Sequence, residues 1–567
     1  MSMKKLTMRM QDQVKLHFMN DTDWSQLENG YVKGCAFSNG DLLLSTKLSE
    51  MFNAQKSFGD FVKVLRPLNG FFAGVRVEER SIFLAVDHVR SFPLFYASSD
   101  KRIFVSDDAY WLREQVSDKN IDELSAAELL LTRTISGNDT LSPSVKQVQP
   151  GEAVALTVTQ EGVRKESSRF FEFGHVQTIE REVTQLALSS DAHLTAAFKR
   201  LAEYAGGSTI VVPLGGGLDS RLVLLMLKRI GYDNIVSFTY GRPGNQESKI
   251  SKKVALTLKI PWYFIRYSNQ DWRRWYASTE WANYARFGNN LCTTPHIQDW
   301  PAVWELKKQR LIPDDSVFVP GHRPSRVLSN APSGVNRRLP VERLKQQPLI
   351  SDDDLASMIC ESYFTLQNWA GQSAEIRRDL SLKVKNVLRP PSTVSSDQAF
   401  GYFDQWSWEN ILAKFMVNSV RVYEFWGYRW WLPLWDLEFI RFWRSLPSHL
   451  RFEKRFENAY VRQLETKTTG KPATPDTSTH NFGPKIVTIL DSLGLRNVAR
   501  IIRARIEYNR HHFAWYGLIN EADYHRAYHG QEDINTYLAN ETIKQAYPQW
   551  KIPKGLDFMA MSARHYE

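Results

Sequence analysis

The sequence contains little cysteine and no long run of apolar residues. Among its 567 residues there are three cysteines, which lie far apart and form no Cys-x-x-Cys pair: Cys35, Cys292 and Cys360. This scarcity argues against a disulfide framework and a structural zinc site. No window reaches the roughly 18 uninterrupted apolar residues of a membrane-spanning helix. Charged residues also interrupt positions 1–19, where a signal peptide is apolar. We therefore expect a cytoplasmic protein without a transmembrane helix.

The composition also lacks any strong bias. Apolar residues make up 43% and charged residues 24% of the chain, which excludes collagen-like, low-complexity and wholly disordered proteins. The net charge is +10, with 72 Lys and Arg against 62 Asp and Glu. Nucleic-acid binding needs a concentrated basic face rather than such a modest average, so we expect no nucleic-acid partner.

The first third of the chain has the pattern of a β-rich domain. Short runs of alternating polarity between residues 34 and 173 are separated by turn residues, which predicts an antiparallel β layer. The clearest runs are 42–44, 70–77, 81–86, 93–97, 103–106 and 153–158. One helix is expected at 121–132, where Asp122 and Glu123 suit the positive end of a helix dipole.

After residue 175 the periodicity changes to alternating helices and strands. We expect helices at 179–205, 218–230 and 246–258, and strands at 209–212, 235–240 and 262–267. This alternation predicts a parallel sheet covered by helices. From Asp352 onward the chain is predicted to be mainly helical, with a surface loop at 466–484. The aromatic block 402–443 is interpreted as a packed helical core rather than as a cofactor or sugar-stacking surface.

The most informative segment is 211–221, Val-Val-Pro-Leu-Gly-Gly-Gly-Leu-Asp-Ser-Arg, between a predicted strand and a predicted helix. Its three glycines let backbone N–H groups approach an anion, the helix start adds positive potential, and the Ser220 hydroxyl is a further donor. The Asp219 carboxylate is the type of ligand used by Mg²⁺ on a polyphosphate. The pattern favours a phosphate-binding loop. The alternative is a tight turn in which Asp219 is only a helix-start charge.

Neither Gly-x-x-x-x-Gly-Lys-Ser/Thr nor Gly-x-Gly-x-x-Gly is present in this segment. It resembles the Ser-Gly-Gly-x-Asp-Ser pyrophosphate loop of the asparagine synthetase family and related ATP pyrophosphatases, with Gly215 in place of the first Ser. Further stretches extend the resemblance over most of the chain. Those similar to the family's class II glutamine-amidotransferase domain are 68–73, 83–88, 93–96 and 104–106, and those similar to its synthetase domain are 236–241, 432–436 and 445–447.

The resemblance implies an α/β fold. It begins with an N-terminal antiparallel β-sandwich of the Ntn-hydrolase type, followed by a parallel-sheet ATP-pyrophosphatase domain with a helical C-terminal part. We place a degenerate amidotransferase-like domain at 1–175, the ATP-binding domain at 176–465 and a helical extension at 466–567. The oligomeric state stays open, a homodimer included.

The resemblance also implies the chemistry. Family members bind ATP and Mg²⁺, activate a carboxylate as an acyl-adenylate with release of pyrophosphate, and let ammonia or another amine displace AMP. The implied nucleotide-binding residues are Leu214, Gly215, Gly216, Gly217, Asp219, Ser220, Ser237, Phe238, Thr239 and Gly321. The implied catalytic residues are Asp219, which is also the metal ligand, Lys454 and Arg429. The expected partners are a small-molecule carboxylate and an amine donor.

The chain departs from the family pattern in three places. Position 2 is Ser2, where the family has a Cys whose own α-amine activates the thiolate, so we expect no glutaminase activity. His322 and Arg323 follow Gly321 where the family has carboxylates. Either this segment is a solvent loop, or a cation has replaced a carboxylate in the site and weakens magnesium binding.

The third departure is at 427–431, where Arg429 and Trp431 replace the family's acidic and basic residues. A free aspartate needs an acidic partner for its ammonium group, because a buried ammonium without one is costly. The change therefore favours an anionic substrate without an ammonium, such as a sugar uronate whose ring packs on Trp430 and Trp431.

Stretches 240–245 and 295–300 resemble family members from surface-polysaccharide gene clusters, which also points to a uronate-amidating ligase. The alternatives are a true asparagine synthetase, dependent on ammonia or glutamine, and a nucleotide-binding pseudoenzyme. Peripheral membrane contact through the amphipathic segment 495–510 is less favoured, because most such helices dock on their own domain.

Overall fold

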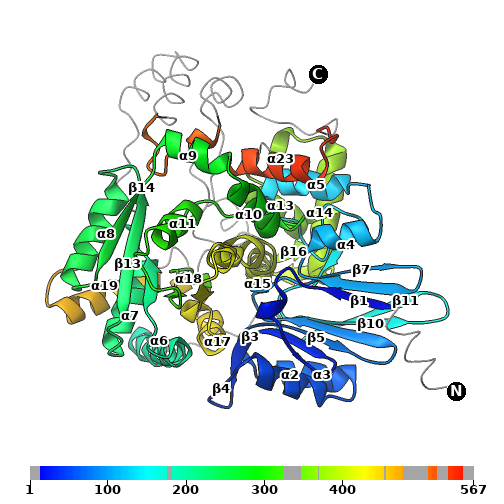
Figure 1. Cartoon of the computed structure of the whole chain (residues 1–567), viewed down its shortest axis with the longest axis horizontal. Coiled ribbons are helices and arrows are strands. Elements are labelled where there is room, and N and C mark those ends of the chain that lie inside the picture. Colours follow the sequence, from blue (N-terminus) through cyan, green and yellow to red (C-terminus); the bar gives the residue numbers. More distant parts are fainter. Residues whose placement is uncertain are drawn as a thin grey trace.

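The computed structural model describes residues 13–174, 182–324, 347–367, 369–451, 455–476, 509–519 and 534–552. The protein has an α/β fold with antiparallel sheets in its N-terminal region, a five-stranded parallel sheet and a helical remainder, which confirms the expected fold class. In Figure 1 the N-terminal sheets, in blue and cyan, lie on one side of the molecule and the parallel sheet, in green, on the other, with helices between them.

The N-terminal region consists of two stacked sheets. Their strands are β1 Val14–His17, β2 Ser25–Leu27, β3 Gly30–Ser38, β4 Asp41–Leu43, β5 Asn69–Val77, β6 Ser81–Val86, β7 Phe95–Ser99, β8 Arg102–Ser106, β9 Lys146–Gln147, β10 Glu152–Val158 and β11 Val163–Arg169. The larger sheet has the order β11-β10-β6-β5-β3-β2, with β4 added to β3, and its pairs are antiparallel. The smaller sheet has the order β1-β8-β7-β9, in which β1 and β8 are parallel.

Apolar side chains between the two sheets explain why these runs form strands. Val75 of the larger sheet and Tyr96 of the smaller belong to one buried core, as expected for alternating strands packed face to face. The outer face of the larger sheet is covered by α2 (Ser45–Asn53) and α3 (Phe58–Leu65), which contribute Phe52 and Phe61, respectively, to a second core. The predicted strands are confirmed, whereas α2, α3 and the parallel β1–β8 pair were not predicted.

The parallel sheet has the order β14-β13-β12-β15-β18, and every neighbouring pair is parallel. Its strands are β12 Ile210–Pro213, β13 Ile235–Gly241, β14 Trp262–Arg266, β15 Val317–Phe318 and β18 Arg429–Trp430. The helices that alternate with the first of them are α6 Val183–Ala205, α7 Asp219–Arg229 and α8 Gln246–Thr257. The apolar side chains of β12 are fully buried, as expected for a strand covered on both faces. The predicted alternation is confirmed.

The rest of the described residues are mainly helical, as predicted for the part from Asp352 onward. The α-helices are α4 Ala109–Gln115, α5 Glu123–Thr132, α9 Asn269–Tyr276, α10 Thr279–Asn289, α11 Trp300–Lys308, α13 Asp352–Tyr363, α14 Ala374–Leu388, α15 Ser396–Trp406, α16 Arg421–Phe425, α17 Leu437–Ser445, α18 Ser448–Arg451, α19 Arg455–Thr469 and α23 Ile534–Ala546. Shorter elements are η1 Asp21–Asp23, η3 Trp369–Gly371, η5 Val417–Val420, η6 Pro433–Trp435, η9 Trp515–Leu518 and the π-helix η4 Ser407–Met416. A small antiparallel sheet pairs β16 Leu349–Ser351 with β17 Thr393–Ser395.

The aromatic block is a packed core, as interpreted. Its largest side chains are buried: Trp406, Trp408, Trp435 and Trp443. The predicted surface loop at 466–484 is partly wrong, because α19 continues to Thr469. Residues 477–484 and 495–508 lie outside the described residues, and so does most of the amphipathic segment considered for membrane contact. Within the described ranges we find no helix with the length and hydropathy of a membrane span.

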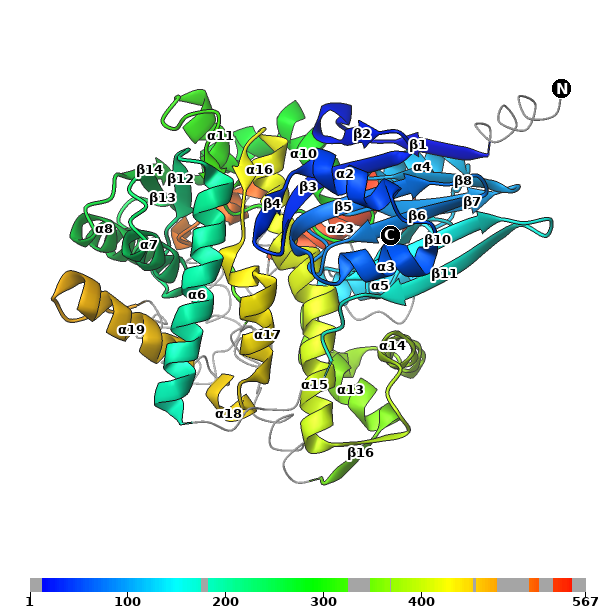
Figure 2. The ribbon, with the colours of Figure 1, turned by 90° about the horizontal axis from the view of Figure 1, so that it is seen from below.

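A buried polar contact joins the N-terminal sheets to the region of the parallel sheet. The Asn69 side-chain amide donates to Asp436 at 3.0 Å and accepts from the backbone N–H of Leu437 at 2.8 Å. Arg200 of α6 donates twice to the same carboxylate, at 2.7 and 2.8 Å. Figure 2 shows α6 beside α17, which starts at this contact. This contact joins the first two predicted domains, and the predicted boundary between residues 465 and 466 falls inside α19. The three-domain division stays a prediction.

Candidate functional site

The glycine-rich segment forms the connection between β12 and α7. The backbone N–H of Leu214 donates to the carbonyl of Phe238 at 2.8 Å, and the Thr239 hydroxyl donates to the carbonyl of Leu214. The Gly215 N–H donates to the Ser220 hydroxyl at 3.3 Å. The loop is thus tied to the adjacent strand β13 and lies at the carboxyl end of β12. Ligands of open parallel sheets bind at this edge.

One side of the loop is open enough for an anion to approach. A Cβ added to Gly217 would meet no atom within 4 Å, and one added to Gly215 would come no closer than 3.7 Å to a Glu247 carboxylate oxygen. Burial raises the pKa of Glu247. The first turn of the 11-residue helix α7 adds backbone N–H groups and positive dipole potential. These features fit the phosphates of a nucleotide.

Gly321 holds a second segment directly against this loop. It follows β15, and a Cβ added to it would lie 2.3 Å from the backbone N of Ser220 and 2.7 Å from the carbonyl carbon of Asp219. Only a residue without a side chain fits such a contact. Of the two alternatives for 317–324, the structure therefore supports a position in the site and excludes a remote solvent loop.

Arg323 brings a positive charge to the start of α7. Its guanidinium forms an ion pair with Asp219, whose side chain is 31% exposed, whereas the Arg323 side chain is only 2% exposed. The Nη2 atom of Arg323 donates to Asp219 Oδ1. The other two guanidinium nitrogens, Nε and Nη1, are buried without a hydrogen-bond partner among the described residues. A cation has therefore replaced the expected carboxylate, and its donors are only partly satisfied.

The residues of the loop fit ATP better than they fit a protein-bound magnesium ion. Mg²⁺ usually takes one or two carboxylates together with phosphate oxygens and water. Here Arg323 pairs with the Asp219 carboxylate, and burial favours the neutral form of Glu247. Among the described residues no group of three or more His, Cys, Asp or Glu could hold a metal ion. The pairing with Arg323 does not favour the expected metal-ligand role of Asp219, and this role stays a prediction.

A buried carboxylate lies next to this second segment. Asp299, which precedes α11, accepts from the Tyr423 hydroxyl at 2.7 Å, and its other oxygen is 3.3 Å from His296 Nδ1. Burial pushes the pKa of Asp299 up, but His296, Tyr423 and the nearby charge of His322 outweigh it and hold the pKa below its ordinary value. His322 Nδ1 is 3.3 Å from the Ser419 hydroxyl. From the sequence, residues 295–300 were identified only by their resemblance to other proteins, and the cluster around Asp299 was not predicted.

The structure brings together most, but not all, of the predicted nucleotide-binding residues. Those in or touching the loop are Leu214, Gly215, Gly216, Gly217, Asp219, Ser220, Thr239 and Gly321. Ser237 is fully buried, and its hydroxyl donates to the Pro261 carbonyl at 3.0 Å. The Phe238 side chain lies in the apolar core. We therefore remove the side chains of Ser237 and Phe238 from the site.

Arg429 is not in the site, which corrects the prediction of a catalytic role. It pairs with Val317 at the amino end of β15, and its side chain donates to the Ser208 hydroxyl at 2.7 Å and the Asp315 carbonyl at 2.9 Å. Both partners precede the strands of the sheet, so Arg429 lies at the edge opposite the loop. Trp430 and Trp431 are buried against Phe71 of the N-terminal sheets. They form core rather than a surface for a sugar ring.

The structure leaves the predicted role of Lys454 untested and gives other roles to several neighbouring charged residues. Lys454 and Ser2 lie outside the described residues. Arg462 pairs with Asp476 at 2.9 Å. Arg221 is fully buried and donates to Glu465 at 2.9 Å, so it anchors α7 to α19 and points away from the loop. Burial raises the pKa of the Cys35 thiol to about 12, which excludes this thiol as a nucleophile near neutral pH.

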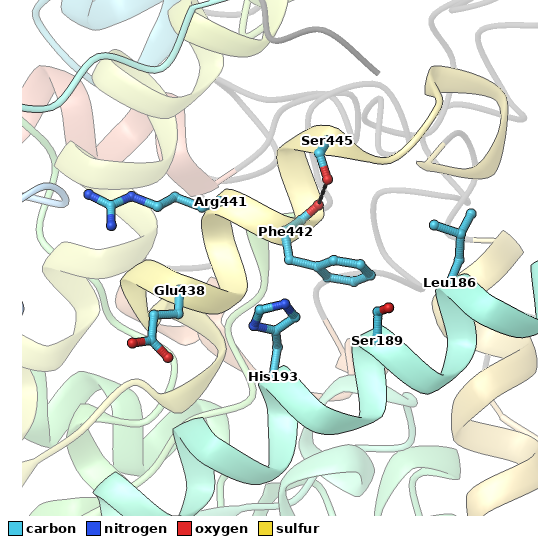
Figure 3. A pocket seen from close by; sticks show the side chains of 7 residues that line it. All are labelled: Leu186, Ser189, His193, Glu438, Arg441, Phe442 and Ser445. Carbon is cyan, nitrogen blue, oxygen red and sulfur yellow. Dashed lines mark hydrogen bonds between the residues drawn. The ribbon is translucent and has the colours of Figure 1, made fainter. Parts of the chain in front are cut away.

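A separate surface groove lies between α6 and α17 (Figure 3). It has a volume of about 430 Å³ and is lined by Leu186, Ser189, His193, Glu438, Arg441, Phe442 and Ser445. The His193 ring stacks on Phe442 with 4.9 Å between ring centres. None of the loop residues lines this groove.

No family model matches the sequence, and no curated protein matches it significantly. Among solved structures, the NH₃-dependent NAD synthetase from Campylobacter jejuni matches 26% of this chain with 12% identity and a TM-score of 0.19. The glutamine phosphoribosylpyrophosphate amidotransferase from B. subtilis matches 42% with 12% identity and a TM-score of 0.19. An allosteric regulatory enzyme of purine biosynthesis matches 55% with 11% identity and a TM-score of 0.18.

The matches cover 60%, 72% and 63% of those three chains, respectively, so this chain spans less than two thirds of the NAD synthetase. The similarity is distant, and at these TM-scores it supports no argument about the site. The fold class rests on the strand pairing of the protein itself.

Proposed function

We propose that the protein is an ATP-dependent, amide-forming ligase of the asparagine synthetase type. It activates a small-molecule carboxylate as an acyl-adenylate with release of pyrophosphate, and ammonia or another amine then displaces AMP. The observation that carries this proposal is the glycine-rich loop at the carboxyl edge of the parallel sheet, with Gly321 packed on its helix start. The backbone amides of this loop and the start of α7 would bind the phosphates.

The nitrogen source in this proposal is a free amine. The Cys35 thiol is buried and its pKa is raised to about 12. This thiol therefore cannot act as the nucleophile of a glutaminase, because the thiolate is the nucleophilic form. The N-terminal sheets then serve as a structural partner for the synthetase region, held to it by the contact between Asn69 and Asp436.

The carboxylate substrate is proposed only as a class. Three residues expected to bind a sugar uronate do not support this substrate. Arg429 lies at the opposite edge of the sheet, and Trp430 and Trp431 lie in the core. The resemblance of 240–245 and 295–300 to surface-polysaccharide proteins still favours a uronate. Aspartate, the substrate of a true asparagine synthetase, belongs in the same assay.

The test is pyrophosphate release from ATP by the full chain, screened with aspartate, nucleotide-linked uronates and amino acids. With an accepted carboxylate, Asp219→Ala should lower turnover by at least about tenfold, because Arg323 loses the partner that positions it. Arg429→Gln, which changes an arginine at the opposite edge of the same sheet, is the matched control and should retain turnover. Equal turnover of wild type and Asp219→Ala would contradict the site assignment.

A second candidate is a nucleotide-binding protein without catalysis. The pairing of Arg323 with Asp219 favours it, because the expected carboxylate is neutralised. In this case ATP binds to the full chain, but no carboxylate in the panel supports exchange of labelled pyrophosphate into ATP. Exchange with any of them rules this candidate out.

A further inference from the structure

We propose that Arg323 supplies, at the phosphate loop, the positive charge that a protein-held magnesium ion would otherwise provide. The loop would then bind the pyrophosphate part of a nucleotide through a guanidinium rather than through a metal–carboxylate contact. This inference rests on the proposed function of the loop and names the group that recognises its anionic ligand.

The backbone fixes where this guanidinium lies. Gly321 contacts the backbone of Ser220 so closely that a Cβ would lie 2.3 Å from its nitrogen. Arg323, two residues further on, reaches the first residue of α7 and donates to Asp219 Oδ1. Its side chain is 2% exposed. Packing and the ion pair with Asp219 therefore together hold the cation beside the loop.

The local charge balance requires such a cation. Two carboxylates, Asp219 and Glu247, lie beside the loop. A polyphosphate approaching them is repelled unless positive charge is fixed nearby. Burial favours the neutral form of Glu247 by raising its pKa, and Arg323 neutralises Asp219. With the charge of Asp219 offset, the loop amides and the helix dipole present positive potential to an anion, and the N–H groups that Arg323 does not use on Asp219 are further donors.

Arg323 also has unused hydrogen-bonding capacity. Its Nε and Nη1 atoms are buried and unpartnered, and unsatisfied buried donors are costly. A cavity of about 10 Å³ lined by Arg323, Glu457 and Tyr460 lies beside it. Such a space has room for about one water molecule. One water cannot satisfy all the remaining N–H groups, so Arg323 keeps hydrogen-bonding capacity beyond its pair with Asp219.

The first test measures binding of inorganic pyrophosphate to the full-length protein by calorimetry, with excess EDTA and separately with excess Mg²⁺. We expect saturable binding in EDTA. Binding that strictly requires Mg²⁺ overturns this inference and leaves the proposed function standing. Absence of both ATP and pyrophosphate binding under either condition overturns the proposed function as well.

The second test replaces the cation. Arg323→Gln should weaken pyrophosphate binding in EDTA roughly 10- to 100-fold, as expected for the loss of a charge-assisted contact. Arg323→Lys keeps the charge and should retain more of the affinity, and Arg429→Gln should bind like wild type. Unchanged affinity in folded Arg323→Gln overturns the inference. If that variant does not fold, as judged by thermal denaturation, Arg323→Lys and the EDTA experiment on the wild type decide.

Discussion

The two edges of the parallel sheet each carry an arginine, and the two residues differ in almost every physical respect. At the carboxyl edge, Arg323 has a side chain that is 2% exposed, pairs with one carboxylate and leaves two nitrogens unpartnered. At the amino edge, Arg429 is exposed and donates to a hydroxyl and a carbonyl of the segments that precede β12 and β15. The first arrangement is costly without a ligand, whereas water can satisfy the remaining donors of the second because Arg429 is exposed.

This difference is the one expected between an arginine that binds a ligand, as we propose for Arg323, and one that stabilises strand connections, as Arg429 does. A buried cation with unsatisfied donors persists only where the surrounding fold enforces it, and such sites concentrate where ligands bind. A solvent-facing arginine that closes a strand connection stabilises that connection modestly. Variants at the closely packed carboxyl edge and at the exposed amino edge of the sheet test this contrast.

The largest effect is expected for Gly321→Ala. Its added methyl group would overlap the backbone of Ser220, 2.3 Å from the nitrogen, so either the loop or the segment after β15 must move. We expect a loss of about 1–3 kcal/mol in the free energy of unfolding, the usual cost of overpacking, and loss of ATP binding. Thermal and denaturant unfolding and ATP calorimetry measure the two effects.

Gly217→Ala is the matched control for that variant. A Cβ at Gly217 meets no atom within 4 Å, so the free energy of unfolding should change little. ATP binding should still weaken, because the methyl group stands where the anion approaches. Equal stability of Gly321→Ala and Gly217→Ala would show that the close contact of the two segments is not present in solution.

A smaller effect at the same edge is expected for Asp299→Asn. The pKa of Asp299 lies below its ordinary value, so its ionised form stabilises the folded state above about pH 4. This contribution is lost as the pH falls through the lowered pKa. The variant should be destabilised by roughly 1–3 kcal/mol at pH 7, as expected for a perturbed buried polar group.

The pH dependence provides the sharper measurement for Asp299. The difference in free energy of unfolding between wild type and Asp299→Asn should narrow as the pH is lowered from 6 to below 4, because only the wild type loses an ionised carboxylate. Denaturant titrations at several pH values measure it. A difference that stays constant over this range would show that Asp299 does not carry the charge.

The sequence predicts the phosphate loop well because all of its determinants are local. A β-branched strand, three glycines and a helix start follow one another within 211–221. The groups that surround it are not local. Asp299 and His322 come from different connections, and only the sheet order brings the charge of His322 close to the carboxylate. Sequence patterns cannot distinguish Arg323 from Arg429, because they do not show which end of a strand each residue occupies.

The smallest effect is expected for Arg429→Ala, which tests the amino edge directly. The variant loses two hydrogen bonds, to Ser208 at 2.7 Å and to the Asp315 carbonyl at 2.9 Å, and a contact of the guanidinium with the Tyr204 ring at 5.6 Å. Because the group is exposed, water replaces these partners, and we expect a loss of no more than about 1 kcal/mol in the free energy of unfolding. ATP binding and pyrophosphate release should match the wild type. A tenfold loss of either in folded Arg429→Ala would contradict the assignment of this edge as support and would restore Arg429 to the site.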